Sequence, residues 1–120
     1  PDMSITNTIP YLTPIDKALE LAITGRVFDA SEAIALELVT ALKKDPLESS
    51  RAIAKTIAEK SPDAIRAIKK LFYSSWNDSE KESLRREAEL QIQVMSQPNQ
   101  MEAVASAIEN RSARFLDSII

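Results

Sequence analysis

A single glycine, Gly25, is the feature of this 120-residue sequence that most restricts its fold. Sheets joined by tight hairpins use glycine repeatedly, because the favoured hairpin turns need left-handed backbone conformations. The rest of the chain is rich in Ala, Leu, Ile, Glu and Lys, residues of which most favour helices. The sequence therefore predicts an all-α fold.

Capping residues predict where these helices begin and end. Gly25 follows an apolar helical run, where a left-handed glycine ends a helix without a side-chain clash. Asp29 is expected to cap the next helix, and Glu32 stands at the capping-box position three residues later. Proline in a first turn predicts further starts, because the missing amide donor is not needed there. These starts follow the capping residues of Thr13-Pro14, Asp45-Pro46 and Ser61-Pro62.

Apolar spacing completes the helical pattern. We expect short helices over residues 4–12 and 101–109 and a long charged helix over 79–95. In the helix after Ser61-Pro62 the spacing predicts a buried face made of Ile65, Ile68, Leu71 and Phe72. Phe72, Tyr73 and Trp76 beside Lys69 and Lys70 are accordingly interpreted as core aromatics beside solvated lysines. The alternative is a nucleic-acid patch with stacking aromatics.

Composition excludes several classes of function. The net charge of −3 lacks the basic footprint of a nucleic-acid-binding protein. No apolar run approaches the ~20 residues that span a bilayer, so no membrane partner is expected. The absence of histidine excludes a Ser-His-Asp triad and a histidine-bearing metal site, and no metal site is predicted. The absence of cysteine excludes disulfides and is compatible with a cytoplasmic location, which we expect.

A set of motifs resembles the C-terminal part of the crotonase superfamily, the enoyl-CoA hydratases and isomerases. In chain order they are TGRVFDASEA, LV, DPL, SPDAIRAIKKL, a helix with Glu87 and Gln91, and a closing run with Glu109, Arg111 and Phe115. The resemblance implies the helical C-terminal domain of the crotonase fold, with the catalytic ββα spiral core lying before Pro1. We expect one helical domain over 1–120, with a division into core-linking helices 1–40 and an oligomerisation part 41–120 as the alternative.

The resemblance implies an enzyme that hydrates or isomerises an enoyl-CoA in acyl-CoA metabolism, without a metal or redox cofactor. Its partners would be the acyl-CoA substrate and further copies of itself, since the family is built on trimers. The isolated chain is expected to be inactive. The competing interpretation is a non-enzymatic helical module for oligomerisation or interaction.

Three site residues follow from the resemblance. Asp2 falls on the turn where isomerases of the family carry an aspartate that transfers the proton; the alternative is a solvated residue or helix cap. Arg111 and Arg114 lie near the positions that contact the CoA nucleotide, and guanidinium groups bind phosphate through charge-assisted hydrogen bonds. The alternative for both arginines is an ion pair with Glu109 or Asp117.

The resemblance also implies strain at one position. Where the family usually has a glycine after the short helix that follows Asp29, this chain has Glu37. We expect Glu37 to adopt the left-handed conformation at a cost of ~1 kcal/mol. We further expect the chain to self-associate through apolar residues that lack a partner, among them Ile5, Ile9, Leu12, Phe115 and Ile119.

Overall fold

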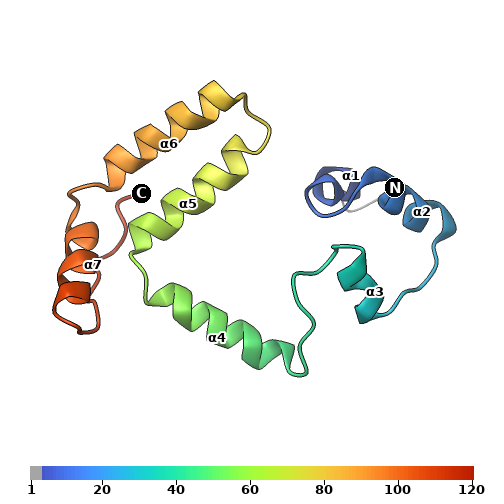
Figure 1. The fold of residues 1–120 in the computed structure, drawn as a ribbon, viewed down its shortest axis with the longest axis horizontal. Helices are drawn as coiled ribbons and strands as arrows, with labels where there is room; N and C mark the ends of the chain where they lie inside the picture. The colour runs from blue at the N-terminus through green and yellow to red at the C-terminus, as the bar shows by residue number, and fades with distance from the viewer. Residues whose placement is uncertain (1–3) are drawn as a thin grey trace. The chain divides into compact units, whose positions relative to one another are not determined.

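The computed structural model describes residues 4–120 and confirms the all-α prediction, with no strand in that range (Figure 1). The helices are α1 Ile5–Thr8, the 3₁₀ helix η1 Ile9–Tyr11, α2 Ile15–Thr24, α3 Ala30–Ala35, α4 Pro46–Ala58, α5 Pro62–Ser75, α6 Glu80–Val94 and α7 Pro98–Ile108. No helix in this range is long and apolar enough to cross a bilayer.

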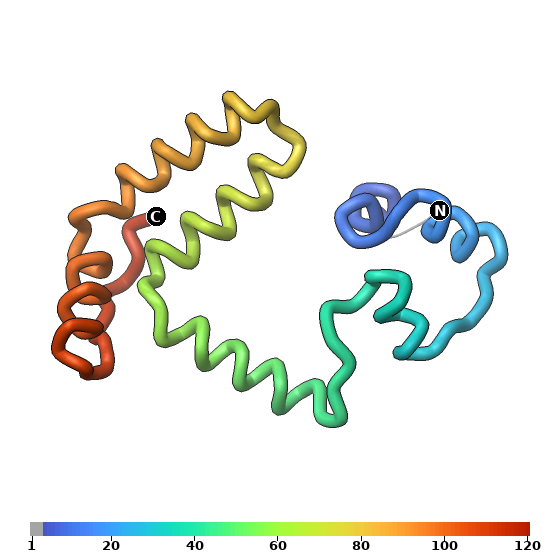
Figure 2. The backbone as a smooth tube through the Cα atoms, viewed as in Figure 1, coloured from blue at the N-terminus to red at the C-terminus, as the bar shows by residue number. Residues whose placement is uncertain are grey.

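The chain divides into two compact units, residues 1–49 and 50–120. The backbone trace in Figure 2 passes from one to the other within α4. The alternative division after residue 40 separated core-linking helices from an oligomerisation part. These two roles are not tested by the compact units, so that division stays a prediction.

In the first unit, the predicted caps form around α2 and α3. Gly25 ends α2 in the left-handed conformation with φ 59°. The Asp29 carboxylate accepts a 2.8 Å hydrogen bond from the Glu32 amide at the start of α3. The Glu32 side chain does not complete a capping box; it pairs with Arg26 at 2.7 Å, and Arg26 also binds Glu20. This guanidinium therefore joins the end of α2 to the start of α3.

The end of α3 confirms the expectation for Glu37, which has φ 62°. The Glu37 amide donates to the Ile34 carbonyl at 3.0 Å, and the Leu38 amide donates to the Ala33 carbonyl at 3.0 Å. These two bonds define a Schellman motif, which normally places glycine at its left-handed position. A glutamate occupies it here.

The predicted N-cap of α2, Thr13, is wrong. Pro14 is the N-cap residue itself, and its carbonyl accepts from the Ala18 amide at 3.1 Å. The Thr13 hydroxyl is buried without a hydrogen-bond partner. Thr13 lies one residue too early, because the proline takes extended rather than helical backbone angles.

In the second unit, α5 packs against α6 and against α7 (Figure 1). Ser61 caps α5 as predicted, through a bond from the Ala64 amide. Ser79 caps α6 in the same way, through a bond from the Glu82 amide, which we had not predicted. The described part of this unit buries few apolar side chains: Ala67 on α5 and Leu90 on α6 are each less than one tenth exposed.

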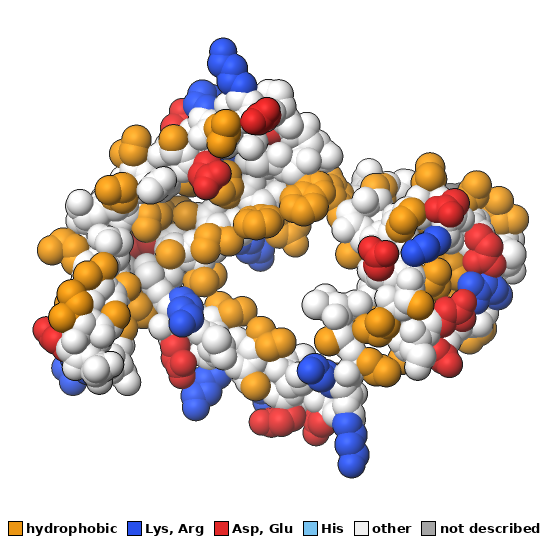
Figure 3. Space-filling view, viewed as in Figure 1, with side chains coloured by type: hydrophobic (Ala, Val, Ile, Leu, Met, Phe, Trp, Pro, Cys, Tyr) orange, Lys and Arg blue, Asp and Glu red, His pale blue; other side chains and the backbone are white. Residues whose placement is uncertain are grey.

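The predicted buried face of α5 is buried only in part, because Ile65 and Leu71 are half-buried and the other two residues are exposed. Ile68 and Phe72 are 52% and 58% exposed, and the Phe72 ring stacks on Trp76, which is also exposed. The small Ala67 faces the core instead. Figure 3 shows exposed hydrophobic side chains along α5 and along α4. Helical spacing identified the apolar face correctly, but the described elements cover it only in part.

Candidate functional site

The C-terminal segment, residues 111–120, carries both arginines proposed to contact CoA and is held by side chains of α5 and α7. The segment has no regular secondary structure and runs from the end of α7 back to the start of α5 (Figure 1). Three of its amides donate to side chains of α5 and α7: Arg114 to Glu102 (2.7 Å), Leu116 to Asn99 (2.7 Å) and Ile119 to Asp63 (2.8 Å). Side chains thus replace the neighbouring strand that an extended segment would otherwise need.

Asp63 is the most deeply buried of these anchors, with 1% of its surface exposed. Its carboxylate also accepts from the Ser118 hydroxyl at 2.7 Å and from the Asn99 side-chain amide at 2.9 Å. The Ser118 hydroxyl, followed by the Asn99 and Ile119 donors, lowers the pKa of Asp63, although burial acts in the opposite direction. The buried charge is therefore satisfied by hydrogen bonds rather than by a cation.

Arg111 lies in a cluster of carboxylates. Its guanidinium donates to Glu102 at 2.9 Å and to Glu109 at 2.5 Å. The Arg111 hydrogen bond, together with the Arg114 amide, lowers the pKa of Glu102 to about 2. The ion pair with Glu109 was the alternative interpretation of Arg111, and the structure contains it. A phosphate would have to compete with two carboxylates for this side chain.

Arg114 is more available. Its backbone amide binds Glu102, but its exposed guanidinium forms no hydrogen-bonded ion pair with any residue between 4 and 120. Asp117, the other suggested partner, pairs with neither arginine in that range. Of the two arginines, Arg114 therefore has the guanidinium group that is more available to bind a phosphate.

Asp2, the predicted proton-transfer residue, lies outside the described residues. Among residues 4–120 there is also no cluster of three or more acidic residues arranged to hold a metal ion.

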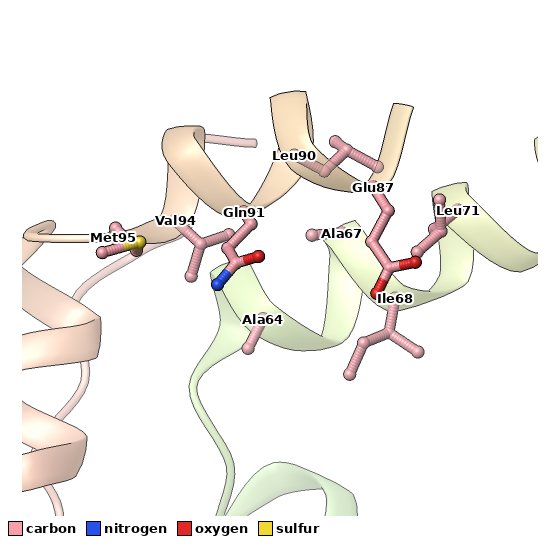
Figure 4. A pocket seen from close by; sticks show the side chains of 9 residues that line it. All are labelled: Ala64, Ala67, Ile68, Leu71, Glu87, Leu90, Gln91, Val94 and Met95. Atoms are coloured by element: carbon pink, nitrogen blue, oxygen red, sulfur yellow. The ribbon is translucent and has the colours of Figure 1, made fainter. Parts of the chain in front are cut away.

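A shallow groove of about 360 Å³ lies between α5 and α6 (Figure 4). Its floor is apolar, and the side chains of Glu87 and Gln91 reach across it from α6. The lining residues are Ala64, Ala67, Ile68, Leu71, Glu87, Leu90, Gln91, Val94 and Met95. The groove offers contact surface, and it brings together no set of groups suited to catalysis.

Sequence reasoning missed the anchors Asp63, Asn99 and Glu102. Asp63 entered the predictions only as part of the helix that follows Ser61-Pro62, and Asn99 was given no role. The bond between them joins residues 36 positions apart, and the Asp63–Ser118 bond spans 55. Local spacing carries no signal for such pairs.

Comparison with known proteins gives a consistent result over nearly the whole chain. The sequence model of the family described as enoyl-CoA hydratase/isomerase matches residues 1–118. A Bacillus subtilis (strain 168) protein named "Probable enoyl-CoA hydratase" is 30% identical over 96% of this chain and 46% of its own length. One from Mycobacterium leprae (strain TN), named "Probable enoyl-CoA hydratase echA8", is 35% identical over 82% of this chain and 39% of its own.

The fold agrees with a solved structure. The crystal structure of an enoyl-CoA hydratase from Mycobacterium tuberculosis H37Rv superposes with a TM-score of 0.81 and 26% identity. That match covers 90% of this chain and 44% of the other. The chain thus spans less than half the length of the relatives that it matches.

Proposed function

Because this chain belongs to the enoyl-CoA hydratase/isomerase family, we propose that it is the helical C-terminal part of an enzyme acting on acyl-CoA thioesters. The observation that carries the proposal is the family match over residues 1–118. The proposed reaction is hydration or double-bond isomerisation of an enoyl-CoA, within fatty-acid or related acyl-CoA metabolism in the cytoplasm.

The proposed chemistry needs groups that lie outside this chain. Two backbone amides would polarise the thioester carbonyl, and stabilisation of the developing oxyanion is the main catalytic contribution in such sites. Carboxylates would move the proton, without a metal or redox cofactor. Asp2 is the one carboxylate that we assign to this task, as the base of an isomerisation. The 120-residue chain by itself is therefore proposed to be inactive.

Arg114 is proposed to meet a phosphate of the CoA moiety. Its guanidinium is exposed and free of hydrogen-bonded carboxylates in residues 4–120, and the Glu102 bond fixes its backbone. Arg111, proposed from the sequence for the same role, is engaged by Glu102 and Glu109. We assign Arg111 a supporting role, in which it holds the start of the C-terminal segment and adds positive charge.

We also propose that the enzyme is a homo-oligomer, trimer-based as in its family. The exposed apolar side chains of α4 support this, since Leu47, Ile53 and Ile57 are 60%, 60% and 46% exposed. The same observation favours the second candidate function, a non-enzymatic helical interaction module. Activity decides between the two.

The experiment joins this chain to the catalytic half of one of its relatives and measures turnover of enoyl-CoA and dienoyl-CoA. We expect turnover by the joined protein and none by the 120-residue chain. Asp2→Asn should lower kcat far more than it raises KM, whereas Arg114→Ala should raise KM with little change in kcat. Arg51→Ala, at an exposed arginine of α4, is the matched control.

Three results would contradict the proposal. An inactive joined protein that is correctly folded favours the interaction module. Unchanged kcat in Asp2→Asn removes the catalytic role of Asp2. A KM in Arg114→Ala equal to that in Arg51→Ala removes the phosphate contact.

A further inference from the structure

The C-terminal segment is held on α5 and α7 by a set of polar contacts. Its apolar side chains Leu116 and Ile119 are 63% and 66% exposed, so burial of these two contributes little to holding the segment. The backbone amides of these same residues donate at 2.7 Å and 2.8 Å to the side chains of Asn99 and Asp63. The position of the segment therefore depends on those acceptors, together with a 3.1 Å bond from the Arg66 guanidinium to the Ile120 carbonyl.

We propose that Asp63 is the positioning residue that fixes residues 115–120 and, through them, the direction in which Arg114 is presented. The carboxylate holds the segment directly, through the Ser118 hydroxyl and the Ile119 amide. It also holds the segment indirectly, through Asn99. Only the ligand of Arg114 rests on the proposed function; the positioning role rests on these contacts.

Asn99 is oriented by Asp63 so that it binds both polar groups of one backbone residue. Its side-chain nitrogen donates to Asp63 Oδ2 at 2.9 Å and to the Leu116 carbonyl at 3.1 Å. Its side-chain oxygen accepts from the Leu116 amide at 2.7 Å. Both hydrogens of the Asn99 amide group are thus used, and a loss of the Asp63 acceptor loosens the contact with Leu116.

An amide in place of the Asp63 carboxylate cannot satisfy this arrangement. Oδ2 faces the Asn99 nitrogen, and Oδ1 faces the Ser118 hydroxyl and the Ile119 amide, which are all donors. Whichever way an asparagine amide is turned, its NH₂ group meets a donor and one buried polar group stays unsatisfied.

The other end of the segment is held independently. Glu102 binds the Arg111 guanidinium and the Arg114 amide without involving Asp63. Loss of the Asp63 contacts should therefore free residues 115–120 while residues 111–114 stay attached to α7. The Arg114 backbone would then keep its bond to Glu102 while the chain that follows it is no longer held in one direction.

The test is amide hydrogen exchange, followed residue by residue by NMR on the 120-residue chain. In Asp63→Asn we expect the Leu116 and Ile119 amides to exchange roughly 10- to 100-fold faster, the equivalent of losing a hydrogen bond to a charged group. The amides of α6 should keep their rates. Asp117→Asn removes an exposed carboxylate of the same segment and should leave all these rates unchanged.

The double variant Asp63→Asn/Asn99→Asp provides a rescue. It exchanges the amide and the carboxylate between the two positions, so a donor again faces an acceptor across the 2.9 Å contact. We expect slower exchange at Ile119 than in Asp63→Asn alone, and incomplete recovery at Leu116 because its carbonyl loses the Asn99 donor.

Two outcomes would overturn the proposal. Wild-type exchange at Leu116 and Ile119 in Asp63→Asn would show that Asp63 does not hold the segment. Equal acceleration in α6 would show that Asp63 stabilises the whole unit instead. Neither measurement uses CoA, so a failure here is separate from a failure of the Arg114 assignment.

Discussion

The Asp63 carboxylate accepts a 2.9 Å hydrogen bond from the side chain of Asn99, which lies 36 residues farther along the chain. This pair joins the first turn of α5 to the first turn of α7 at a point where both side chains are buried. A buried carboxylate without partners would be costly, but here several donors surround it. The hydrogen bonds of this polar cluster hold α5 and α7 together, a role that apolar packing has at most helix contacts.

The first prediction is a pH dependence that belongs to Asp63. Its pKa is lowered in the folded chain, so the unfolded chain binds more protons in acid. The resulting stabilisation is complete above the unfolded pKa, about 3.9. It disappears as the pH falls through the lower folded value.

Urea unfolding of the wild type should therefore show a free energy of unfolding that falls as the pH drops below about 4.5. Asp63→Asn should be less stable at neutral pH and show a shallower fall. A residual slope is expected, because the pKa of Glu102 is also lowered, to about 2. Asp117→Asn should follow the wild type, and parallel curves for wild type and Asp63→Asn would contradict the assignment.

Helix ends were predictable because their determinants are local. The Asp29 cap links residues three apart, and Gly25 ends α2 through its own backbone angle. The resemblance also placed Glu37 correctly, since the length of α3 fixes where its left-handed residue falls. The prediction of Thr13 as the N-cap was wrong because Pro14, although suited to the first turn of a helix, has an extended conformation and precedes that turn.

Burial was not predictable in the same way. The spacing of Ile68 and Phe72 identifies an apolar face, and whether these two side chains are covered depends on surface that residues 4–120 do not provide. The Asp63 cluster was missed for a related reason. Its contacts join α5 to α7 and to residues near 120, and no local pattern distinguishes Asp63 from an acid that merely favours a helix N-terminus.

The second prediction concerns self-association through α4. Ile57 lies on the apolar face of this helix and is exposed in the isolated chain. Ile57→Glu should weaken association, because burial of an unpaired charge in an interface is unfavourable. Ala52→Glu, on the opposite side of the same helix, is the matched control. Light scattering that shows a monomer for the wild type at high concentration would rule out the expectation.

The third prediction tests the backbone at the end of α2. Gly25 has φ 59°, and an added Cβ atom would meet nothing within 4 Å. Gly25→Ala should therefore lower the free energy of unfolding by ~1 kcal/mol through backbone strain alone. Gly25→Asn should cost less, because asparagine tolerates this conformation. An unchanged melting temperature in Gly25→Ala would show that α2 ends differently in solution.

The last prediction reverses this substitution at the end of α3. Glu37 has the left-handed backbone that Gly25 has, but it carries a side chain. Glu37→Gly should release ~1 kcal/mol of strain, and greater freedom of the unfolded chain offsets part of the gain. The variant also loses an exposed contact with Lys17 at 3.7 Å, which we expect to contribute little.

Glu37→Ala separates the strain from the loss of the charge and of the Lys17 contact. Both variants remove the charge and the Lys17 contact, and they differ only in the Cβ atom. In an ordinary helix the alanine variant is the more stable by ~1 kcal/mol. At a left-handed position the order should invert, with Glu37→Gly the more stable of the two in thermal or urea unfolding. If alanine is the more stable, Glu37 does not carry the strain, and the Schellman motif does not end α3 in solution.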